Sequence, residues 1–372
     1  MYTKKIGDLA TYINGYAFKP SDWGESGLPI VRIQDLTGTS YQTNYYDGDY
    51  PKKIEINNGD VLISWSASLG VYVWDRGKAL LNQHIFKVVF DKEYIDKNYF
   101  VYAIKHSLNK MTLKTHGATM KHIVKNDFYN IEIPYPNRET QIKMSKALLK
   151  VENVIEYRKQ QLEQFDLLIK SRFVEMFGDV DLTMNKNEWI EIKHIGTVVS
   201  GATPKTIINE YWNGDFNWFT PAELSNNSGY IFESERKISQ EGVDSCSLQK
   251  LPVNTVLLTS RAPIGKLAIA GTECYCNQGF KNIICGTKVL PRYLYYLLLF
   301  NTEFLNSLGR GATFKEISKS IVENIKIPLP PIELQNEFAR FVEQVEETKT
   351  QVQKSLDEAQ LLFNSLMQEY FG

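Results

Sequence analysis

The chain has 372 residues, of which 43% are hydrophobic, 23% charged and 12% aromatic, and its formal net charge at pH 7 is −1. This length allows two ordinary domains with full cores, and the composition is that of a soluble globular protein. A net charge near zero excludes a uniformly basic nucleic-acid-binding protein, but not one in which basic and acidic residues are segregated along the chain.

Neither a secretory signal nor a membrane span is evident in the sequence. The amino-terminal segment MYTKKIGDLA lacks the apolar stretch of a signal peptide. The longest apolar run, Tyr293–Phe300, is far shorter than the ~20 residues that cross a bilayer. We therefore expect a cytoplasmic protein. The four cysteines lack a second pair or a histidine at zinc-ligand spacing, which predicts ordinary thiols and no metal site.

The chain contains two copies of one unit. Residues 117–141 read GATMKHIVKNDFYNIEIPYPNRETQ and residues 311–335 read GATFKEISKSIVENIKIPLPPIELQ, which align without a gap at an offset of 194 residues. The offset continues to Phe177-Gly178 and Phe371-Gly372. Upstream the repeat is fainter, with Asn82-Gln83 matching Asn277-Gln278. Two copies indicate a duplicated unit and not a solenoid.

In chain order, each copy begins with roughly 135 residues of mixed α/β (α+β) character. Strand-like runs occur at Val61-Leu62-Ile63, Phe86–Phe90, Thr255–Leu258 and Lys281–Ile284. Helical stretches are predicted at Lys97–Met111 and Pro291–Leu308. We expect two similar globular domains, residues 1–137 and 179–331.

Each copy ends in one long predicted helix, Arg138–Phe177 within a spacer of residues 138–178, and Ile332–Phe371 within residues 332–372. An IPxP segment precedes each helix, and proline disfavours helix in the residue before it. Apolar residues recur in steps of three and four over about five heptads, which indicates a coiled coil. The alternative is two amphipathic helices that each pack on their own domain. The predicted interface residues are Leu148, Val151, Ile155, Leu162, Phe165, Ile169, Val342, Val345, Val352, Leu356, Phe363 and Leu366.

Three polar residues interrupt this apolar seam. Arg158, Arg172 and Lys349 each occupy a position at which the other copy is apolar. Buried polar residues can fix register and partner choice, so we hypothesise that the two helices prefer each other. The same side chains could instead extend to solvent at the edge of the seam.

The order domain–helix–domain–helix allows the two helices to pair antiparallel. A helix of about 40 residues is a rod of ~60 Å, and the two heads would then be separated and inverted about a pseudo-twofold axis. Such heads suit a target with twofold symmetry, such as duplex DNA. Because the heads diverge in sequence, the two half-sites should differ.

Local charge favours a DNA-facing surface in each head. Residues 97–126 contain six lysines and no acidic residue, and residues 248–302 contain six basic residues against Glu273. Phosphate contacts from such residues supply affinity and register rather than sequence information. A merely solvated basic face is the alternative for either stretch alone.

Candidates for DNA contact lie on the predicted loops, where Arg, Asn, Gln and Ser/Thr side chains can meet base edges. Arg261 is the favoured guanine contact. The recurrent Asn-Gln pairs could contact adenine, but recurrence in heads of different specificity favours a structural role for them. The candidates are Tyr16, Phe18, Lys19, Ser64, Trp65, Ser66, Asn82, Gln83, His116, Thr119, Lys121, Ser260, Arg261, Asn277, Gln278, Arg310, Thr313 and Lys315.

The order of these segments resembles the specificity subunits of type I restriction-modification systems. The opening GYAFKPSDW…GLPIVRIQDL is similar to the start of a target recognition domain, and SGATPK, WFTPAEL, CNQGFKNI and GATFKEIS in the second copy follow the same pattern. IPLPPIELQ before the last helix also fits. Thr203 and Lys205 of SGATPK join the candidate DNA contacts through this resemblance.

The resemblance implies a non-catalytic protein in which each head binds one half of a bipartite double-stranded DNA target. It also implies that the paired helices dock two methyltransferase subunits, which methylate one adenine in each half-site, and that two translocating endonuclease subunits complete the complex. Adenosylmethionine, ATP and magnesium would belong to those partners, and this chain would carry no cofactor.

A search for catalysis in the sequence gives no strong motif. An NPPY-like methyltransferase motif, a glycine-rich methyl-donor loop and a GxxxxGK[ST] phosphate loop are all missing. A nuclease pattern can be assembled from Asp181, Glu191 and Lys193, but such spacing arises readily by chance. The competing hypotheses are a coiled-coil scaffold with degenerate heads and, more remotely, a standalone nuclease.

Overall fold

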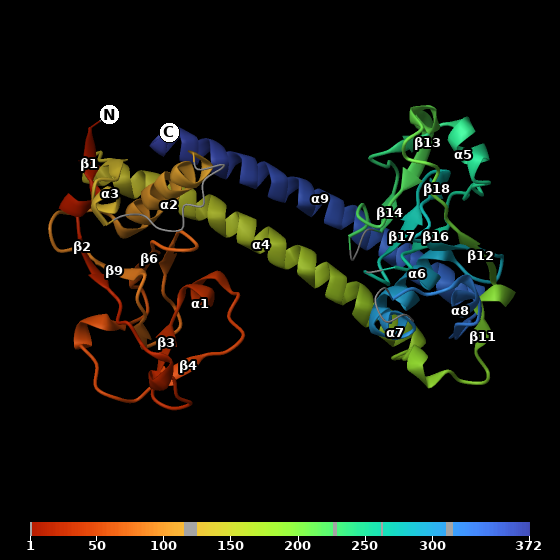
Figure 1. Cartoon of the computed structure of the whole chain (residues 1–372), viewed down its shortest axis with the longest axis horizontal. Coiled ribbons are helices and arrows are strands. Elements are labelled where there is room, and N and C mark those ends of the chain that lie inside the picture. The colour runs from red at the N-terminus through yellow and green to blue at the C-terminus, as the bar shows by residue number, and fades with distance from the viewer. Residues whose placement is uncertain (1, 115–124, 226–228, 262, 310–314) are drawn as a thin grey trace. The chain divides into compact units, whose positions relative to one another are not determined.

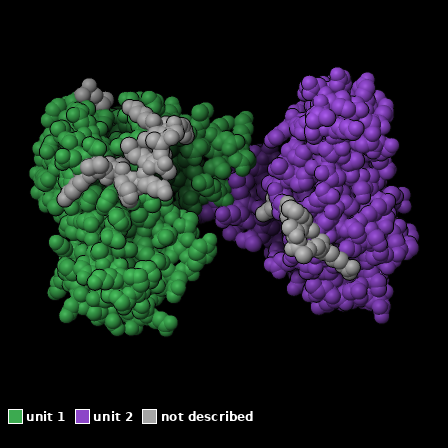
Figure 2. All heavy atoms as spheres, viewed as in Figure 1, with its two compact units in different colours: residues 1–159, 353–372 green, residues 160–352 purple. Residues whose placement is uncertain are grey.

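The computed structural model describes residues 2–114, 125–225, 229–261, 263–309 and 315–372 (Figure 1). The chain forms two compact units, residues 1–159 with 353–372 (unit 1) and residues 160–352 (unit 2), coloured separately in Figure 2. Each unit thus contains one globular head and a part of both long helices. The long helices supply part of the core of each head, so each compact unit combines one of the expected head segments, 1–137 or 179–331, with parts of the two expected helical segments.

The head of unit 1 is built on two four-stranded sheets. One has the order β2-β9-β6-β7 and is antiparallel, and the other has the order β4-β3-β8-β5, in which β3 and β8 run parallel. A separate two-stranded sheet pairs β1 with β10. The strands are β1 (Thr3–Lys5), β2 (Thr11–Asn14), β3 (Leu28–Val31), β4 (Asn44–Tyr46), β5 (Glu55–Ile56), β6 (Val61–Ser64), β7 (Gly70–Val73), β8 (Ala79–Leu81), β9 (Ile85–Val89) and β10 (Glu132–Pro134), and the helices are α1 (Ile33–Thr37), α2 (Lys97–Lys114) and α3 (Lys125–Tyr129).

The head of unit 2 repeats this plan with a five-stranded sheet, β12-β19-β16-β17-β14, and a three-stranded sheet, β15-β13-β18. In the smaller sheet β13 and β18 run parallel, as β3 and β8 do in unit 1. The strands are β11 (Ile190–Glu191), which pairs with β20 (Lys326–Ile327), β12 (Gly196–Ser200), β13 (Trp212–Phe219), β14 (Tyr230–Ile231), β15 (Lys237–Ile238), β16 (Val256–Leu258), β17 (Leu267–Ala270), β18 (Cys274–Cys276) and β19 (Lys281–Cys285), and the helices are α5 (Gln240–Ser245), α6 (Pro291–Phe300), α7 (Thr302–Ser307) and α8 (Lys319–Glu323).

The two long helices have the predicted bounds. α4 spans Arg138–Phe177 and α9 spans Ile332–Phe371, so that both ends of the helix recur at the offset of 194 residues. The predicted strands are also confirmed within one or two residues. The helix predicted over Pro291–Leu308 is instead divided into α6 and α7 at Asn301. The buried side-chain amide of Asn301 donates to the carbonyl of Val180 at 3.0 Å and to that of Leu297 at 2.9 Å, which fixes the chain at the junction between α6 and α7.

A buried glutamine fixes the start of each long helix. Gln141 is 1% exposed, and its amide donates to the carbonyl of Pro136 at 2.9 Å while its side-chain oxygen accepts from the Asp96 backbone at 2.9 Å. Gln335, at the equivalent position, is fully buried and donates to the carbonyl of Pro330 at 2.8 Å. The same side chain thus ties each IPxP segment to its helix and to its head.

The apolar seam of the two long helices also contributes to the hydrophobic core of each head. In unit 1, Leu148 and Ile155 of α4 share a core with Phe363 of α9 and with Tyr99 of α2. In unit 2, Ile169 and Phe173 of α4 share a core with Phe338 of α9 and Tyr293 of α6. All twelve predicted interface residues are buried or half-buried. The two sequence-based alternatives therefore both apply, since the helices pair with each other and also pack on the heads.

The polar residues of the seam contact the opposite helix. In unit 2, Lys349 forms an ion pair with Asp166, and Arg172 forms one with Glu337 at 2.8 Å, so rising residue numbers on α4 meet falling numbers on α9. In unit 1, Arg158 donates to the hydroxyl of Ser355 at 3.2 Å. The helices are therefore antiparallel, and each interrupting residue has a specific partner across the seam.

Candidate nucleic-acid interface

In unit 1, the predicted contact residues gather where parallel strands end. β3 and β8 pair Val31 with Leu81, so both strands end at the same edge of their sheet. Beyond this edge, the backbone of Gln83 donates to the carbonyl of Tyr16 at 2.9 Å and to the side chain of Asn82 at 2.8 Å. The Asn82 side chain is therefore used inside its own turn, whereas the side chain of Gln83 is exposed.

Unit 2 has an equivalent corner, which we define in each head as the place where two parallel strands end and the Asn-Gln turn follows. β13 and β18 pair Phe219 with Cys276, and the next residue, Asn277, accepts a hydrogen bond from the backbone of Gly279 at 2.8 Å through its side chain. The exposed Gln278 accepts a hydrogen bond from the hydroxyl of Thr203, so the structure brings these two predicted residues together. In both heads, the asparagine shapes the turn and the glutamine faces outward.

Several of the predicted loop residues are buried and hold the loops in place. Ser64, Ser66 and Ser260 are at most 4% exposed. Ser64 donates to the carbonyl of Ser68 at 2.5 Å, and Ser260 donates to the carbonyl of Gly279 at 3.0 Å. Trp65 is half-buried and stacks on Phe86 with ring centroids 5.6 Å apart. These side chains build the loops and do not project from them.

The opening loop of unit 1 divides in the same way. Tyr16 is 40% exposed and lies edge-on against Phe18 at 5.0 Å between centroids. Phe18 is only 6% exposed and belongs to the core beside β3 and β8, because its ring packs under the loop. Lys19 and Lys205 are exposed on the surfaces of their units. His116, Thr119, Lys121, Arg310 and Thr313 lie outside the described residues.

Arg261 is exposed but is engaged by a carboxylate. Its Nε lies 3.1 Å from Glu316, and the two residues also form an isolated antiparallel bridge. The same Glu316 lies 3.4 Å from the ammonium of Lys281, whose side chain is 8% exposed. Lys315, the neighbour of Glu316, is exposed. One acidic side chain thus holds two of the basic groups that the sequence assigned to the DNA-facing surface.

Other basic residues of the two stretches are also paired with acids that lie elsewhere in the sequence. Lys105 lies 3.4 Å from Glu152, and Arg292 lies 3.0 Å from Glu346. Lys110 and Lys288 are exposed. The positive potential of each head is therefore smaller than the count of basic residues in the stretches indicates.

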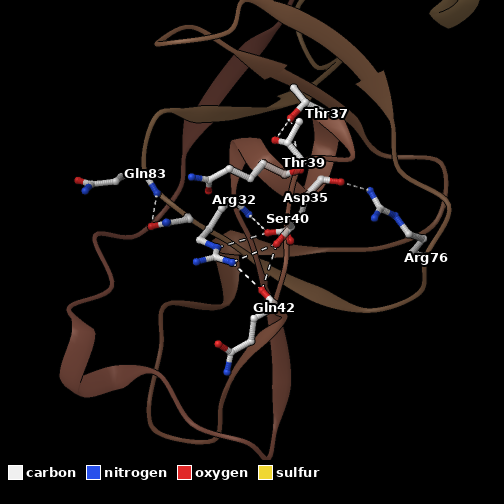
Figure 3. A network of polar contacts seen from close by, with 10 residues as sticks. Arg32, Asp35, Thr37, Thr39, Ser40, Gln42, Arg76 and Gln83 are labelled. Atoms are coloured by element: carbon white, nitrogen blue, oxygen red, sulfur yellow. Dashed lines mark hydrogen bonds and ion pairs between the residues drawn. The ribbon is translucent and has the colours of Figure 1, made fainter. Parts of the chain in front are cut away.

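A polar network in unit 1, not foreseen from the sequence, surrounds Arg32 (Figure 3). The guanidinium of Arg32 donates to the carbonyl of Gln42 at 2.7 Å and to the hydroxyl of Ser40 at 3.2 Å. The backbone of Arg32 donates to Asp35 at 2.8 Å, and Arg76 donates to the Asp35 carbonyl at 2.9 Å. The available signal was the pair RIQDL and FTPAEL, since Glu223 accepts from the Thr220 backbone at 2.6 Å in the same manner.

The residues of the nuclease pattern are occupied locally. Asp181 accepts from the backbone of Thr183 at 2.9 Å, and Glu191 pairs with Lys193 at 2.7 Å, which lowers the pKa of Glu191. The four cysteines are free thiols, and burial raises the pKa of Cys285 to about 12. Across the described residues, no cluster of three or more His, Cys, Asp or Glu side chains could hold a metal ion. In the same part of the chain, no helix has the length and apolarity needed to span a membrane.

Comparison with known proteins gives one consistent family. The profile of the type I restriction modification DNA specificity domain matches residues 1–165 and 184–360. The EcoBI specificity subunit of Escherichia coli is 23% identical over 98% of this chain and 83% of its own length. The MjaIX specificity subunit of Methanocaldococcus jannaschii is 42% identical, over 46% of this chain and 41% of its own length.

The fold agrees with this result. The crystal structure of the type I restriction-modification S subunit from M. genitalium superposes with a TM-score of 0.61 at 15% identity, covering 100% of this chain and 96% of the other. The chain has two matched domains, a mixed α/β head in each and a long helix after each head. It therefore belongs to the type I restriction modification DNA specificity family, whose members recognise DNA sequence.

Proposed function

We propose that each head binds one half of a bipartite, asymmetric double-stranded DNA target in the cytoplasm, and that the chain acts within a complex whose chemistry lies on other subunits. The observation that carries this proposal is the common corner of the two heads. In both heads, two parallel strands end beside an exposed glutamine, Gln83 in unit 1 and Gln278 in unit 2. The sequences of the other loops differ between the two heads. A shared frame with different loops suits two related but unequal half-sites.

We further propose that two methyltransferase subunits dock on the long helices, with two endonuclease subunits completing the complex. Adenosylmethionine, ATP and magnesium would bind those partners. The support is an exposed leucine pair that recurs at the offset of 194 residues. Leu167 and Leu168 of α4 are 55% and 46% exposed, and Leu361 and Leu362 of α9 are 72% and 50% exposed.

These pairs lie away from the buried seam of their helices. Ile169 and Phe363, each next to one leucine pair in the sequence, are buried. Ser171 and Ser365, which occupy equivalent positions of the repeat, are exposed like the leucines. Exposed leucines on a helix cost free energy in water and are typical of a binding surface. Two patches of the same residue pair at equivalent positions of the repeat fit two copies of one partner.

The recognition proposal is tested by co-expressing the chain with a cognate methyltransferase subunit in a host that lacks adenine methylation, and by mapping methyladenine across the genome. We expect a bipartite motif with one modified adenine in each half. Exchanging residues 179–331 for those of another specificity subunit should change one half only. A stable complex without methylation would instead favour the coiled-coil scaffold, and metal-dependent cleavage by the chain alone would favour a nuclease.

The docking proposal is tested by the composition of the purified complex. The double substitution Leu167→Asp/Leu168→Asp should remove one methyltransferase copy, Leu361→Asp/Leu362→Asp should remove the other, and the combination should remove both. Tyr157→Asp is the matched control, because Tyr157 is 68% exposed on α4 but its counterpart in α9 is Gln351. Native mass spectrometry that finds two copies on either double variant, or one copy on the control, contradicts the docking proposal.

A further inference from the structure

The segment of residues 37–43 in unit 1, which begins at the last residue of α1, is a polar surface segment with the sequence TGTSYQT. It contains hydroxyl, amide and phenol side chains and no charged residue. Tyr41 is fully exposed, and Thr39, Gln42 and Thr43 are exposed as well. These groups can donate and accept hydrogen bonds, as base edges in the major groove require.

The loop is held by bonds to its backbone and to the hydroxyl groups of Thr37, Thr39 and Ser40. The Arg32 side chain, 19% exposed, bonds the carbonyl of Gln42 and the hydroxyl of Ser40 from inside the loop (Figure 3). Ser40 itself donates to the Gln42 carbonyl at 3.1 Å. The amide of Gln42 and the ring of Tyr41 thus remain outside on a braced backbone. A braced loop loses little conformational entropy on binding, which favours recognition over a loop that must first be ordered.

The loop begins at the same corner as the predicted contact residues. Arg32 directly follows β3, and Asn82 directly follows β8, its parallel partner, with the Asn82 backbone donating to the Val31 carbonyl at 3.1 Å. Figure 3 shows Gln83 beside the Arg32 network. The loop and the outward glutamine therefore belong to one surface of unit 1.

The two heads share the carboxylate that braces this segment but differ in the sequence that follows it. In unit 2, Glu223 accepts from both the backbone and the hydroxyl of Thr220, at 2.6 and 2.7 Å, as Asp35 accepts from the Arg32 backbone. The sequences that follow are different, TGTSYQT in unit 1 and SNNSGYI in unit 2. The carboxylate brace is retained and the sequence after it differs, as expected if residues 37–43 and the corresponding segment determine two different half-sites. The recurrent Asn-Gln turn cannot supply such a difference.

We propose that residues 37–43 determine the sequence of the half-site bound by unit 1, with Gln42 and Tyr41 contacting base edges in the major groove. This inference rests on the proposed DNA recognition. The Gln42 amide can bond adenine through two hydrogen bonds, and the Tyr41 phenol can bond an acceptor or pack on a thymine methyl group. Arg32 is a positioning residue that keeps the loop backbone in place.

The test compares the full chain, in complex with its methyltransferase subunit, with the variant Tyr41→Ala/Gln42→Ala. Binding is measured by competition with duplexes that carry single base-pair changes in either half of the mapped target. For the natural chain, a change at a contacted pair should weaken binding about 5- to 150-fold. In the variant, this penalty should fall to about onefold at one or more positions of one half-site, while every penalty in the other half-site persists.

The control is Tyr2→Ala, because Tyr2 is an exposed aromatic residue of the same unit, 66% exposed, beside the β1–β10 sheet. It should leave all penalties unchanged. Penalties that persist throughout both half-sites in the double variant overturn the inference, as does their loss in both half-sites at once. If the natural chain itself shows no bipartite preference, the proposed function fails and not the assignment of this loop.

Discussion

The hydroxyl of Tyr102 donates a hydrogen bond of 2.7 Å to Glu152, and at an offset of 194 residues Tyr296 donates one of 3.2 Å to Glu346. Each bond joins a helix of the head to a long helix. The duplication is therefore retained in individual polar contacts as well as in the order of elements.

We expect Tyr296→Phe to be more destabilising than Tyr102→Phe. Burial raises the pKa of Glu346, and Arg292, the Tyr296 hydroxyl and Lys349 oppose this rise, so Tyr296→Phe removes the hydroxyl donor from a partly buried carboxylate. Glu152 is more exposed and water can replace the lost bond. The free energy of unfolding should fall by about 1.5 kcal/mol for Tyr296→Phe and about 0.5 kcal/mol for Tyr102→Phe. Urea denaturation measures both, and equal losses would contradict the argument.

Gln335→Leu should destabilise the chain by about 1–3 kcal/mol, because it leaves buried backbone groups without their partners. Gln335 accepts from the Leu290 backbone at 2.8 Å and donates to the carbonyls of Lys288 and Pro330. Gln344→Leu is the control, since Gln344 is exposed on the same helix. The measurement is the midpoint temperature of thermal unfolding. An equal decrease in both variants would show that the hydrogen bonds of the buried Gln335 amide do not stabilise the fold.

The charge pair between Lys349 and Asp166 predicts a rescue by reversal. Lys349→Asp places two carboxylates together and should lower the stability of the helix pairing by about 0.3–1 kcal/mol, because the pair is partly exposed. Adding Asp166→Lys should restore most of this loss. The free energies of the two single variants and the double variant, measured at low and high salt, give the coupling. A double variant no better than Lys349→Asp alone would rule out a specific pairing role.

The parts of the fold that follow from local pattern could be predicted from the sequence. The bounds of α4 and α9, the strand β6 and the start of α2 depend on periodicity and on the IPxP segments, which are visible along the chain. The break at Asn301 was missed because it depends on a contact with Val180, more than a hundred residues away.

The candidate interface could be predicted only in part, for the same reason. Composition identified Arg261 and Lys281 as basic but could not show that both meet Glu316. Phe18 looked like a loop residue, and its burial depends on the sheet formed by β3 and β8. The brace at Arg32 joins a side chain to backbone carbonyls, which no composition or spacing records.

His106 gives a pH dependence of known sign. Burial and the nearby Lys110 lower its pKa below the ordinary value of 6.5, and its Nε2 has no hydrogen-bond partner within the described part of the chain. The unfolded chain therefore binds more protons near pH 6.5, and the free energy of unfolding should fall as the pH drops through that value. His106→Phe keeps the packing against Phe371 and removes this loss. Urea denaturation at pH 7.5 and 5.5 should show a smaller decline for the variant; equal declines would contradict the assignment.

Glu316→Gln should separate stability from DNA binding. The carboxylate holds Lys281, which is almost fully buried, so its loss should lower the free energy of unfolding by about 1–3 kcal/mol. The same change releases the exposed Arg261 and removes a negative charge from the proposed DNA-facing loop. If Arg261 then reaches a phosphate, non-specific DNA should bind more tightly and the salt dependence of log K should steepen by about one. Titration of a random duplex at several salt concentrations measures this slope. Weaker binding with an unchanged slope would mean that Glu316 orders the loop for DNA, and that Arg261 is not held back by it.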